Sequence, residues 1–327
     1  MKRIVLSFLM IFLLSNLVYA QAELPDSGIL PDSAFYGMKK TFEGIGNIFA
    51  FSAEAKAERA LKLAEKRLAE AEAMANKGKP DFVDGLSQEY ENKVNEANEI
   101  ATLAKEAQDR EKLAELVSTA TSQHIIVLDE VQEIVPEQAK ERIAAARERS
   151  IRGNQEALKA LARENPEKAA EVAMGVAESR ANKAKQASDE GDEEKAGEAA
   201  EEYEKYARFG DEISSIAQQV GKDPSKVNEL VATATSLHIT VLEDVLKKVP
   251  EQAKSSIQRV IEQSKMGRDS VVGPLEERGL PIPDVARGRP ADVPAGEEAD
   301  AEEREQEAGE AGAPTTGASS ETPRGRP

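Results

Sequence analysis

The two histidines of this chain are its first candidates for a functional site, because the chain has no other histidine and the two occupy equivalent places in a repeated segment. His124 lies in LAELVSTATSQHIIVLDEVQEIVPEQAK, which begins at Leu113, and His238 lies in VNELVATATSLHITVLEDVLKKVPEQAK, which begins at Val227. Histidine is a frequent metal ligand and proton carrier. The repetition therefore raises the hypothesis of a duplicated site.

The neighbours of the two histidines favour a structural role instead. If each segment is helical, the residues three and four positions from either histidine are threonine, alanine, valine and leucine. Neither a carboxylate nor a second histidine stands on the same face, so a metal ion would need ligands from other helices. We therefore predict that His124 and His238 are structural and half-buried, with metal binding as the alternative, and we predict no cofactor.

A hydroxyl run and an acidic run are the other candidates for binding. The hydroxyl run consists of Thr119, Thr121 and Ser122, and it recurs as Thr233, Thr235 and Ser236. Such hydroxyls commonly bond to carbonyls of the preceding helical turn, which we predict here. The stretch DEGDEE at 189–194 lacks the spacing of a calcium-binding loop, so we predict a solvated turn. The sequence contains no GxSxG, HExxH or phosphate-binding glycine loop, and we predict that the protein is not an enzyme.

The elements that hold these residues come from an internal duplication. The two 28-residue segments are identical at 18 positions. The shared apolar residues follow steps of three and four, which predicts one buried stripe along a helix, and they include Leu116, Val117, Ala120, Val127, Leu128, Val131 and Val135. Pro136 and Pro250 then end each helix and begin the next.

Weaker matches extend the duplication toward the N-terminus. Gly78 corresponds to Gly191, and Tyr90 corresponds to Tyr203, both with a shift of 113 residues. We predict an all-α fold of two tandem antiparallel helical bundle units with three to four helices each, at 53–164 and 165–272. Gly153 and Gly267 also correspond, and a glycine inside a helix in both copies predicts a close helix contact or a bend.

The composition of the chain restricts which classes of partner, site and core it can have. The formal net charge of −18 and the absence of any clear Lys/Arg cluster argue against nucleic acid. The chain has no cysteine, so disulfides and thiolate metal sites are excluded. Only 4% of the residues are aromatic and there is no tryptophan, so alanine and medium aliphatic residues must form the core of closely packed helices.

The two ends of the chain differ from the repeated middle. Lys2 and Arg3 precede an apolar run that ends at Ala20, which predicts a signal peptide at 1–20, cleaved after Ala20, and a secreted or extracytoplasmic protein. An uncleaved membrane anchor is the alternative. Residues 21–52 are predicted to form a linker and an aromatic N-terminal cap. Residues 273–327 lack apolar periodicity and are predicted to be a disordered acidic tail.

The stretch from Leu30 to Ala71, LPDSAFYGMKKTFEGIGNIFAFSAEAKAERALKLAEKRLAEA, resembles the N-terminal part of a family of exported bacterial and archaeal proteins, the 5667 family, known only as a domain of unknown function. The matching features are the Leu-Pro-x-Ser turn, Tyr36, Lys39 and the AExRL motif at 64–68. The helix with histidine and VPEQAK also resembles a later part of that family. The resemblance implies export and a helical fold, and it names no substrate.

Three functional hypotheses follow. The first is a secreted, non-catalytic helical scaffold or binding protein of the cell envelope or exterior, with an unknown protein or envelope partner. The second is an extracytoplasmic cation- or metal-binding protein, suggested by the acidic charge and the paired histidines. The third is a membrane-surface-associated protein that uses the aromatic segment from Phe35 to Phe51, with Lys39 and Lys40 at the headgroups. Self-association is also compatible with the sequence.

Overall fold

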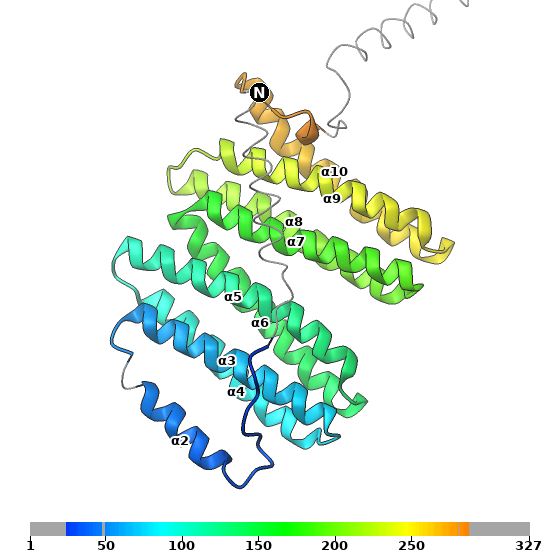
Figure 1. Ribbon diagram of the computed structural model, residues 1–327. Coiled ribbons are helices and arrows are strands. Elements are labelled where there is room, and N and C mark those ends of the chain that lie inside the picture. Colours follow the sequence, from blue (N-terminus) through cyan, green and yellow to red (C-terminus); the bar gives the residue numbers. More distant parts are fainter. Residues whose placement is uncertain (1–23, 48–49, 281, 288–327) are drawn as a thin grey trace, which may run out of the picture.

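The computed structural model describes residues 24–47, 50–280 and 282–287, so the predicted signal peptide lies outside the described part of the chain. The long helices there are α3 (Ala53–Asn76), α4 (Asp81–Leu103), α5 (Ala107–Ile134), α6 (Glu137–Glu164), α7 (Pro166–Glu190), α8 (Glu193–Gln219), α9 (Ser225–Lys248) and α10 (Glu251–Glu277). The shorter elements are α2 (Tyr36–Asn47) and the 3-10 turn η1 (Val285–Arg287). Consecutive long helices form antiparallel hairpins that stack into one array (Figure 1).

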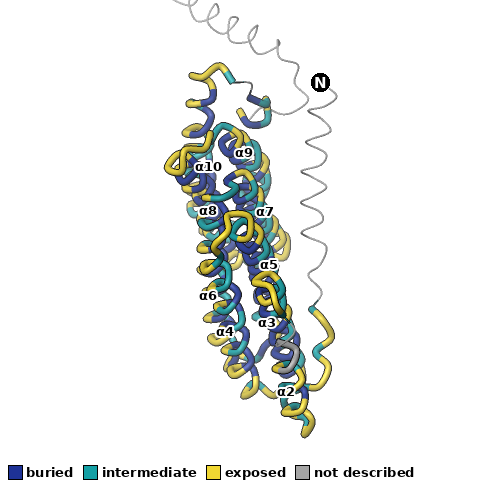
Figure 2. The backbone as a smooth tube through the Cα atoms, turned by 90° about the vertical axis from the view of Figure 1, so that its left-hand side faces the viewer, coloured by how far each residue is buried: buried dark blue, intermediate teal, exposed yellow. Residues whose placement is uncertain are grey.

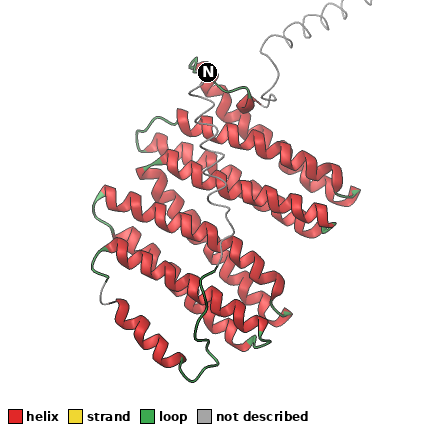
Figure 3. Ribbon diagram, in the orientation of Figure 1, coloured by secondary structure: helices red, strands yellow, loops and turns green. Residues whose placement is uncertain are grey.

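The hairpins build two layers. Viewed along the edge, α3, α5, α7 and α9 form one layer and α4, α6, α8 and α10 form the other (Figure 2). The prediction of an all-α fold is confirmed, because the regular elements between residues 24 and 287 that can be described are all helical (Figure 3). None of those helices is long and apolar enough to cross a membrane.

The duplication is visible in the backbone. Helices α3 to α6 correspond to α7 to α10, and the same type of cap ends α3 and α7. Gly78 and Gly191 have φ angles of +67° and +77°, a left-handed conformation that glycine adopts without steric strain. Behind them the amides of Lys79 and Asp192 donate to carbonyls of the last helical turn, at 3.0 and 2.9 Å. Each copy therefore contains two hairpins.

The predicted apolar stripe forms the core. Val117, Leu128 and Val131 are buried in the first copy, and Leu242 and Val245 are buried in the second. Alanines from α7 and α8 fill much of the space between helices. The core does not stop at the boundary between the copies, because Leu158 and Leu161 of α6 belong to the same cluster as the residues of α7 to α9. The two sequence units share one continuous interior.

The duplicated glycine in α6 allows a close approach between helices. A Cβ atom on Gly153 would lie 2.9 Å from Nδ2 of Asn98 on α4, which is closer than side chains pack. A Cβ atom on Gly267 would lie at an ordinary 3.6 Å from Oδ2 of Asp211 on α8. The predicted close contact is therefore confirmed at Gly153, while Gly267 has space for a methyl group.

The predicted start of the C-terminal tail at residue 273 is wrong. Helix α10 continues through Pro274 to Glu277. Leu275, Ile282 and Ala286 are then buried against the core of the second copy, and the hydroxyl of Ser236 donates to the carbonyl of Ala286 at 3.3 Å. These few apolar residues cover the end of the array without a periodic pattern, which is why helical spacing missed them. Residues 288–327 lie outside the described part of the chain.

Candidate functional site

The two histidines lie inside the array rather than in a groove. His124 and His238 are 1% and 4% exposed. Each ring meets the edge of the duplicated tyrosine, Tyr90 or Tyr203, with 5.5 Å between ring centroids. The closest carboxylate to His124 belongs to Glu65, whose Oε1 lies 3.6 Å from Nε2. Across the described residues, no group of three or more His, Cys, Asp or Glu side chains could hold a metal ion.

The hydroxyl run takes the predicted structural role in the first copy, whereas Ser236 of the second copy donates to the carbonyl of Ala286 and not to the preceding turn. The hydroxyls of Thr121 and Ser122 donate to carbonyls of the preceding turn, at 2.6 Å to Val117 and 2.7 Å to Ser118. In the acidic run, Asp192 caps α8 by accepting from the amide of Lys195 at 3.1 Å. These residues therefore complete helix hydrogen bonding.

The burial of His238 makes stability depend on pH. Burial lowers the pKa of His238 from its ordinary 6.5 to about 4. The unfolded chain therefore takes up a proton below pH 6.5 while the folded chain does not, and stability falls as the pH drops from 6.5 toward 4. We expect the wild-type chain to lose about 2 kcal/mol more than a His238→Gln variant between pH 7 and pH 5, measured by urea unfolding.

The comparison with His238→Gln also cancels the effect of Asp211, whose titration changes the stability in the opposite direction as the pH falls. Burial raises the pKa of Asp211 from 3.8 to about 6, so this carboxyl group contributes stability below pH 3.8 that is lost as the pH rises through 6. Asp211 is present in both proteins, so its contribution cancels. Equal losses of stability in the two proteins between pH 7 and pH 5 would contradict the effect assigned to His238.

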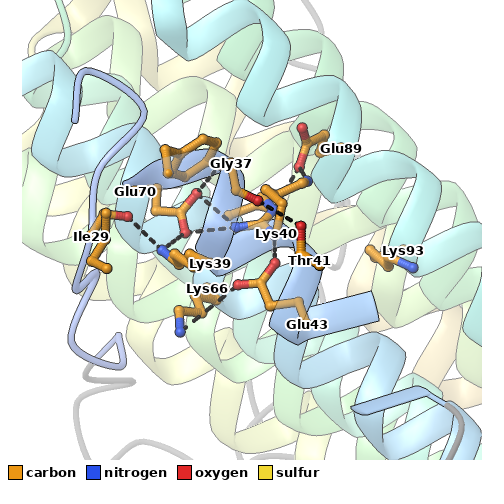
Figure 4. Close-up of polar contacts among 12 residues, drawn as sticks. Ile29, Gly37, Lys39, Lys40, Thr41, Glu43, Lys66, Glu70, Glu89 and Lys93 are labelled. Carbon is orange, nitrogen blue, oxygen red and sulfur yellow. Dashed lines mark hydrogen bonds and ion pairs between the residues drawn. The ribbon is translucent and has the colours of Figure 1, made fainter. Parts of the chain in front are cut away.

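Helix α2 is the segment whose chemistry the core does not explain. It lies beside α3 at the free end of the array (Figure 1). Its inner face is charged and buried, as Figure 4 shows for Lys39 beside Glu70. The Nζ atom of Lys39 donates to the carbonyls of Ser27 and Ile29 at 3.0 and 2.7 Å and forms an ion pair with Glu70. Tyr36 also donates to Glu70, at 2.7 Å, so this carboxylate is satisfied although it is fully buried.

Arg67 of α3 is the centre of the same ionic cluster. Its guanidinium bonds to both oxygens of Glu70, at 2.6 and 2.7 Å, and contacts Glu89 of α4 at 2.7 Å. Glu43 of α2 forms a further ion pair with it, and Lys40 of α2 pairs with Glu89. Burial acts to lower the pKa of Arg67, but the surrounding carboxylates raise it above its ordinary value, so the side chain is charged. Helix α2 is therefore attached to the array by ion pairs.

The outward side of α2 is uncharged and largely apolar. We use the term outer face for Phe35, Gly37, Met38, Thr41, Phe42 and Gly44, all of which are exposed. Phe35, Met38 and Phe42 are 59%, 53% and 65% exposed. The three charged residues of α2 all lie on the inner face, including the two lysines that the membrane hypothesis assigned to headgroups. This helix thus reverses the usual arrangement, in which the apolar side is buried.

A second ionic cluster, between α5, α7 and α8, shows that α2 has the same position on the first copy as α5 has on the second. Arg180 of α7 corresponds to Arg67, and Glu202 of α8 corresponds to Glu89. Arg180 forms an ion pair with Asp129 of α5 and lies 3.4 Å from Glu202. Glu43 of α2 therefore forms an ion pair with Arg67 in the first copy, as Asp129 of α5 does with Arg180 in the second. Helix α2 covers the first copy in the way that α5 covers the second.

One position in the two clusters carries opposite charges. The position held by Glu70 in the first copy is held by Lys183 in the second. Glu70 accepts from Lys39 of α2, whereas Lys183 lies 3.4 Å from Asp129 of α5. Each of these two residues carries the charge opposite to that of the side chain it meets on the covering helix. Helical spacing alone did not reveal this pairing, although an arginine among alanines at the same place in both copies was a signal for it.

Comparison with known proteins finds a family model that is similar to part of this arrangement. Residues 28–138 match the family model described as Domain of unknown function (DUF5667). The predicted resemblance is confirmed for this segment, which runs from the loop before α2 to the start of α6. The match covers about a third of the chain, and the family brings no assigned activity. A comparison with curated proteins finds no match.

A solved structure shares the fold. It is described as "Circular tandem repeat protein with novel repeat topology and enhanced subunit contact surfaces". The similarity covers 82% of this chain with a TM-score of 0.54 and 16% sequence identity, and this chain spans 60% of the length of that structure. At this identity the likeness shows the helical repeat fold alone.

Proposed function

We propose that this protein is a secreted, non-catalytic helical scaffold or binding protein of the cell envelope or exterior, and that its partner contacts the outer face of α2. The single observation that carries the proposal is the exposure of Met38 and Phe42 on α2, and of Phe35 just before it, while the charged residues of that helix are paired with the array. A soluble protein rarely exposes neighbouring large apolar side chains unless they meet a partner.

The rest of the fold suits a protein that holds α2 in place for a partner to bind. Neighbouring hairpins pack against one another through buried apolar residues, so the array is a rigid support for the helix at its end. Helix α2 has only 12 residues, and a helix of that length is marginal in water by itself. Its ion pairs with Glu70 and Glu89 therefore hold it in the helical form in which a partner would meet it. The location outside the cytoplasm rests on the sequence of residues 1–20.

A membrane surface is a second candidate for the partner. Phe35, Met38 and Phe42 could enter the interfacial region of a bilayer, where aromatic side chains are favourable. The observation that favours it is the lack of charge on the outer face. Lys39 and Lys40 contribute nothing to such binding while they are paired with the array, so attraction to acidic lipid is not expected. We therefore rank a protein partner above a membrane.

The experiment compares the wild type with a Phe35→Ser/Phe42→Ser variant in sedimentation with isolated cell envelopes of the source cells. We expect the wild type to sediment with the envelopes and the variant to lose at least ten-fold in bound fraction. A Met266→Ser variant is the matched control, because Met266 is also an exposed apolar residue but lies on α10. The exported protein should begin at Gln21.

Two results of this experiment would decide against the proposal. If wild type and double variant sediment equally with envelopes, the outer face is not the binding surface. If the wild type fails to sediment at all, the envelope role fails. Binding of the wild type to protein-free phosphatidylcholine vesicles at the level seen with envelopes would replace the protein partner with the membrane.

A further inference from the structure

We propose that the outer face of α2 binds the outer face of a second copy of this chain, so that two arrays meet end to end around a two-fold axis. This inference rests on the proposed function, because it names the partner of the same surface.

The lack of charge on the outer face favours a second copy of this acidic chain over a basic partner. The chain has a net charge of −18, so two copies repel each other over most of their surfaces. The outer face is the part of the N-terminal end that lacks charge, since Lys39, Lys40 and Glu43 are paired on the inner face. A basic partner would instead be drawn to the acidic flanks of the array. An uncharged apolar face suits an equally acidic partner.

The shape of the outer face is complementary to itself. Large residues form a ridge along one side of the helix, with Phe35, Met38 and Phe42 at steps of three and four. Gly37, Thr41 and Gly44 are small residues beside the ridge, and a Cβ atom added at either glycine would meet no atom within 4 Å. A two-fold axis therefore places the ridge of each copy over the small residues of the other.

The outer face can be buried without unpairing a side chain. The side-chain hydroxyl in it belongs to Thr41, and this hydroxyl already donates to the carbonyl of Gly37 at 3.0 Å. At the start of α2 the amides of Tyr36 and Lys39 donate to the carbonyls of Ser33 and Phe35. Covering the face with a second copy therefore removes apolar area from water and breaks none of these hydrogen bonds.

The position of α2 leaves room for the second copy. The helix lies at the end of the array beside α3, with no described element on its outward side (Figure 1). Hairpins α5–α6 and α7–α8 each pack between two neighbouring hairpins, whereas the last hairpin, α9–α10, is covered on its outward side by η1. A second α2 would continue this side-by-side stacking of helices by one more step and would close the exposed end of both chains.

The size of the face predicts a weak dimer. With roughly 200 Å² for a whole large side chain, the three ridge residues expose on the order of 350 Å² per copy. Two copies then bury well under the roughly 1,200 Å² of a stable complex, which indicates a weak and transient dimer. The dimer should therefore appear only at high local concentration, as on a crowded envelope.

The first test is sedimentation velocity of the mature chain from 10 µM to 1 mM. We expect the average sedimentation coefficient of the wild type to rise toward that of a dimer, and a Phe42→Asp variant to remain monomeric. Leu103→Asp is the control, because Leu103 is an equally exposed apolar residue on α4 and should leave the dimer intact. Circular dichroism of each variant verifies that the array is folded.

The second test traps the contact and does not depend on the folding of a charged variant. The chain has no cysteine, so a single Met38→Cys residue, at the middle of the ridge, can form a disulfide only between copies. We expect an oxidised dimer from Met38→Cys at least ten-fold faster than from Met266→Cys, whose methionine is also exposed. Equal rates, together with a wild type that stays monomeric at 1 mM, would overturn the inference.

The outcomes separate this inference from the proposed function. A monomeric protein that still sediments with envelopes through Phe35 and Phe42 retains the binding role and excludes the second copy as its partner. A monomeric protein that binds phosphatidylcholine vesicles through the same residues assigns the outer face to lipid and also overturns the dimer. A dimer that does not bind envelopes confirms the contact between copies and removes the envelope role.

Discussion

A Leu128→Asp variant is expected to unfold the first copy at room temperature. Leu128 is completely buried in the core formed by α3, α4, α5 and α6. The substitution removes apolar contacts and places a carboxylate among hydrocarbon groups without a partner. The combined loss is on the order of 5 kcal/mol, which is comparable with the whole stability of a domain. Circular dichroism at 222 nm should show a large loss of helix, and urea unfolding should lose its cooperative transition.

The control for this variant is Leu103→Asp. Leu103 is 78% exposed at the end of α4, so the same change of side chain should alter the free energy of unfolding by about 0.5 kcal/mol or less. If Leu128→Asp kept the helicity and the melting temperature of the wild type, the assignment of the repeated apolar stripe to the core would be wrong.

An Asp129→Asn variant is expected to destabilise the junction between the two copies by about 3 kcal/mol or more. Asp129 is surrounded by three cations, Arg180, Arg147 and Lys183. Burial acts to raise the pKa of Asp129, but these cations lower it below its ordinary value, so the carboxylate is charged. Asparagine has almost the same shape and cannot neutralise them. The variant therefore leaves buried Arg180 with Glu202 as its remaining carboxylate, 3.4 Å away.

The matched control is Asp244→Asn on α9. Asp244 pairs with Lys247 at 2.9 Å, but both side chains are largely exposed, and solvent screening makes the contribution of such a pair to stability small. Urea unfolding of both variants at low and high salt measures the difference. A loss of under 1 kcal/mol for Asp129→Asn would show that the junction depends on its apolar contacts and not on this cluster.

Periodicity predicted the helices because each one buries a stripe that recurs with the helical repeat. The steps from Leu116 to Val135 located α5, and the same steps located α9. Pro136, Pro250 and the glycines at 78 and 191 then placed the connections. Local sequence was sufficient for these features because a helix and its ends are determined by neighbouring residues.

The outer face and the ionic clusters could not be predicted in this way. Periodicity shows that α2 is amphipathic, but it cannot show that the apolar side is the exposed one. That outcome depends on Arg67 and Glu70, which are provided by another helix 24 or more residues away. Likewise, the partner of Arg180 is 51 residues distant in the sequence. The tail boundary was misplaced for a similar reason, since Ile282 and Ala286 are held by tertiary contacts alone.

The covering of Arg67 and Glu70 by α2 also limits how far the array can grow. Glu243 is the counterpart of Asp129 in the second copy, so a chain added head to tail would have to bring its Arg67 and Glu70 to Glu243. These two residues are already covered by α2, with Glu43 paired to Arg67 and Lys39 paired to Glu70. Helix α2 therefore blocks head-to-tail addition, and filaments built in that way are disfavoured.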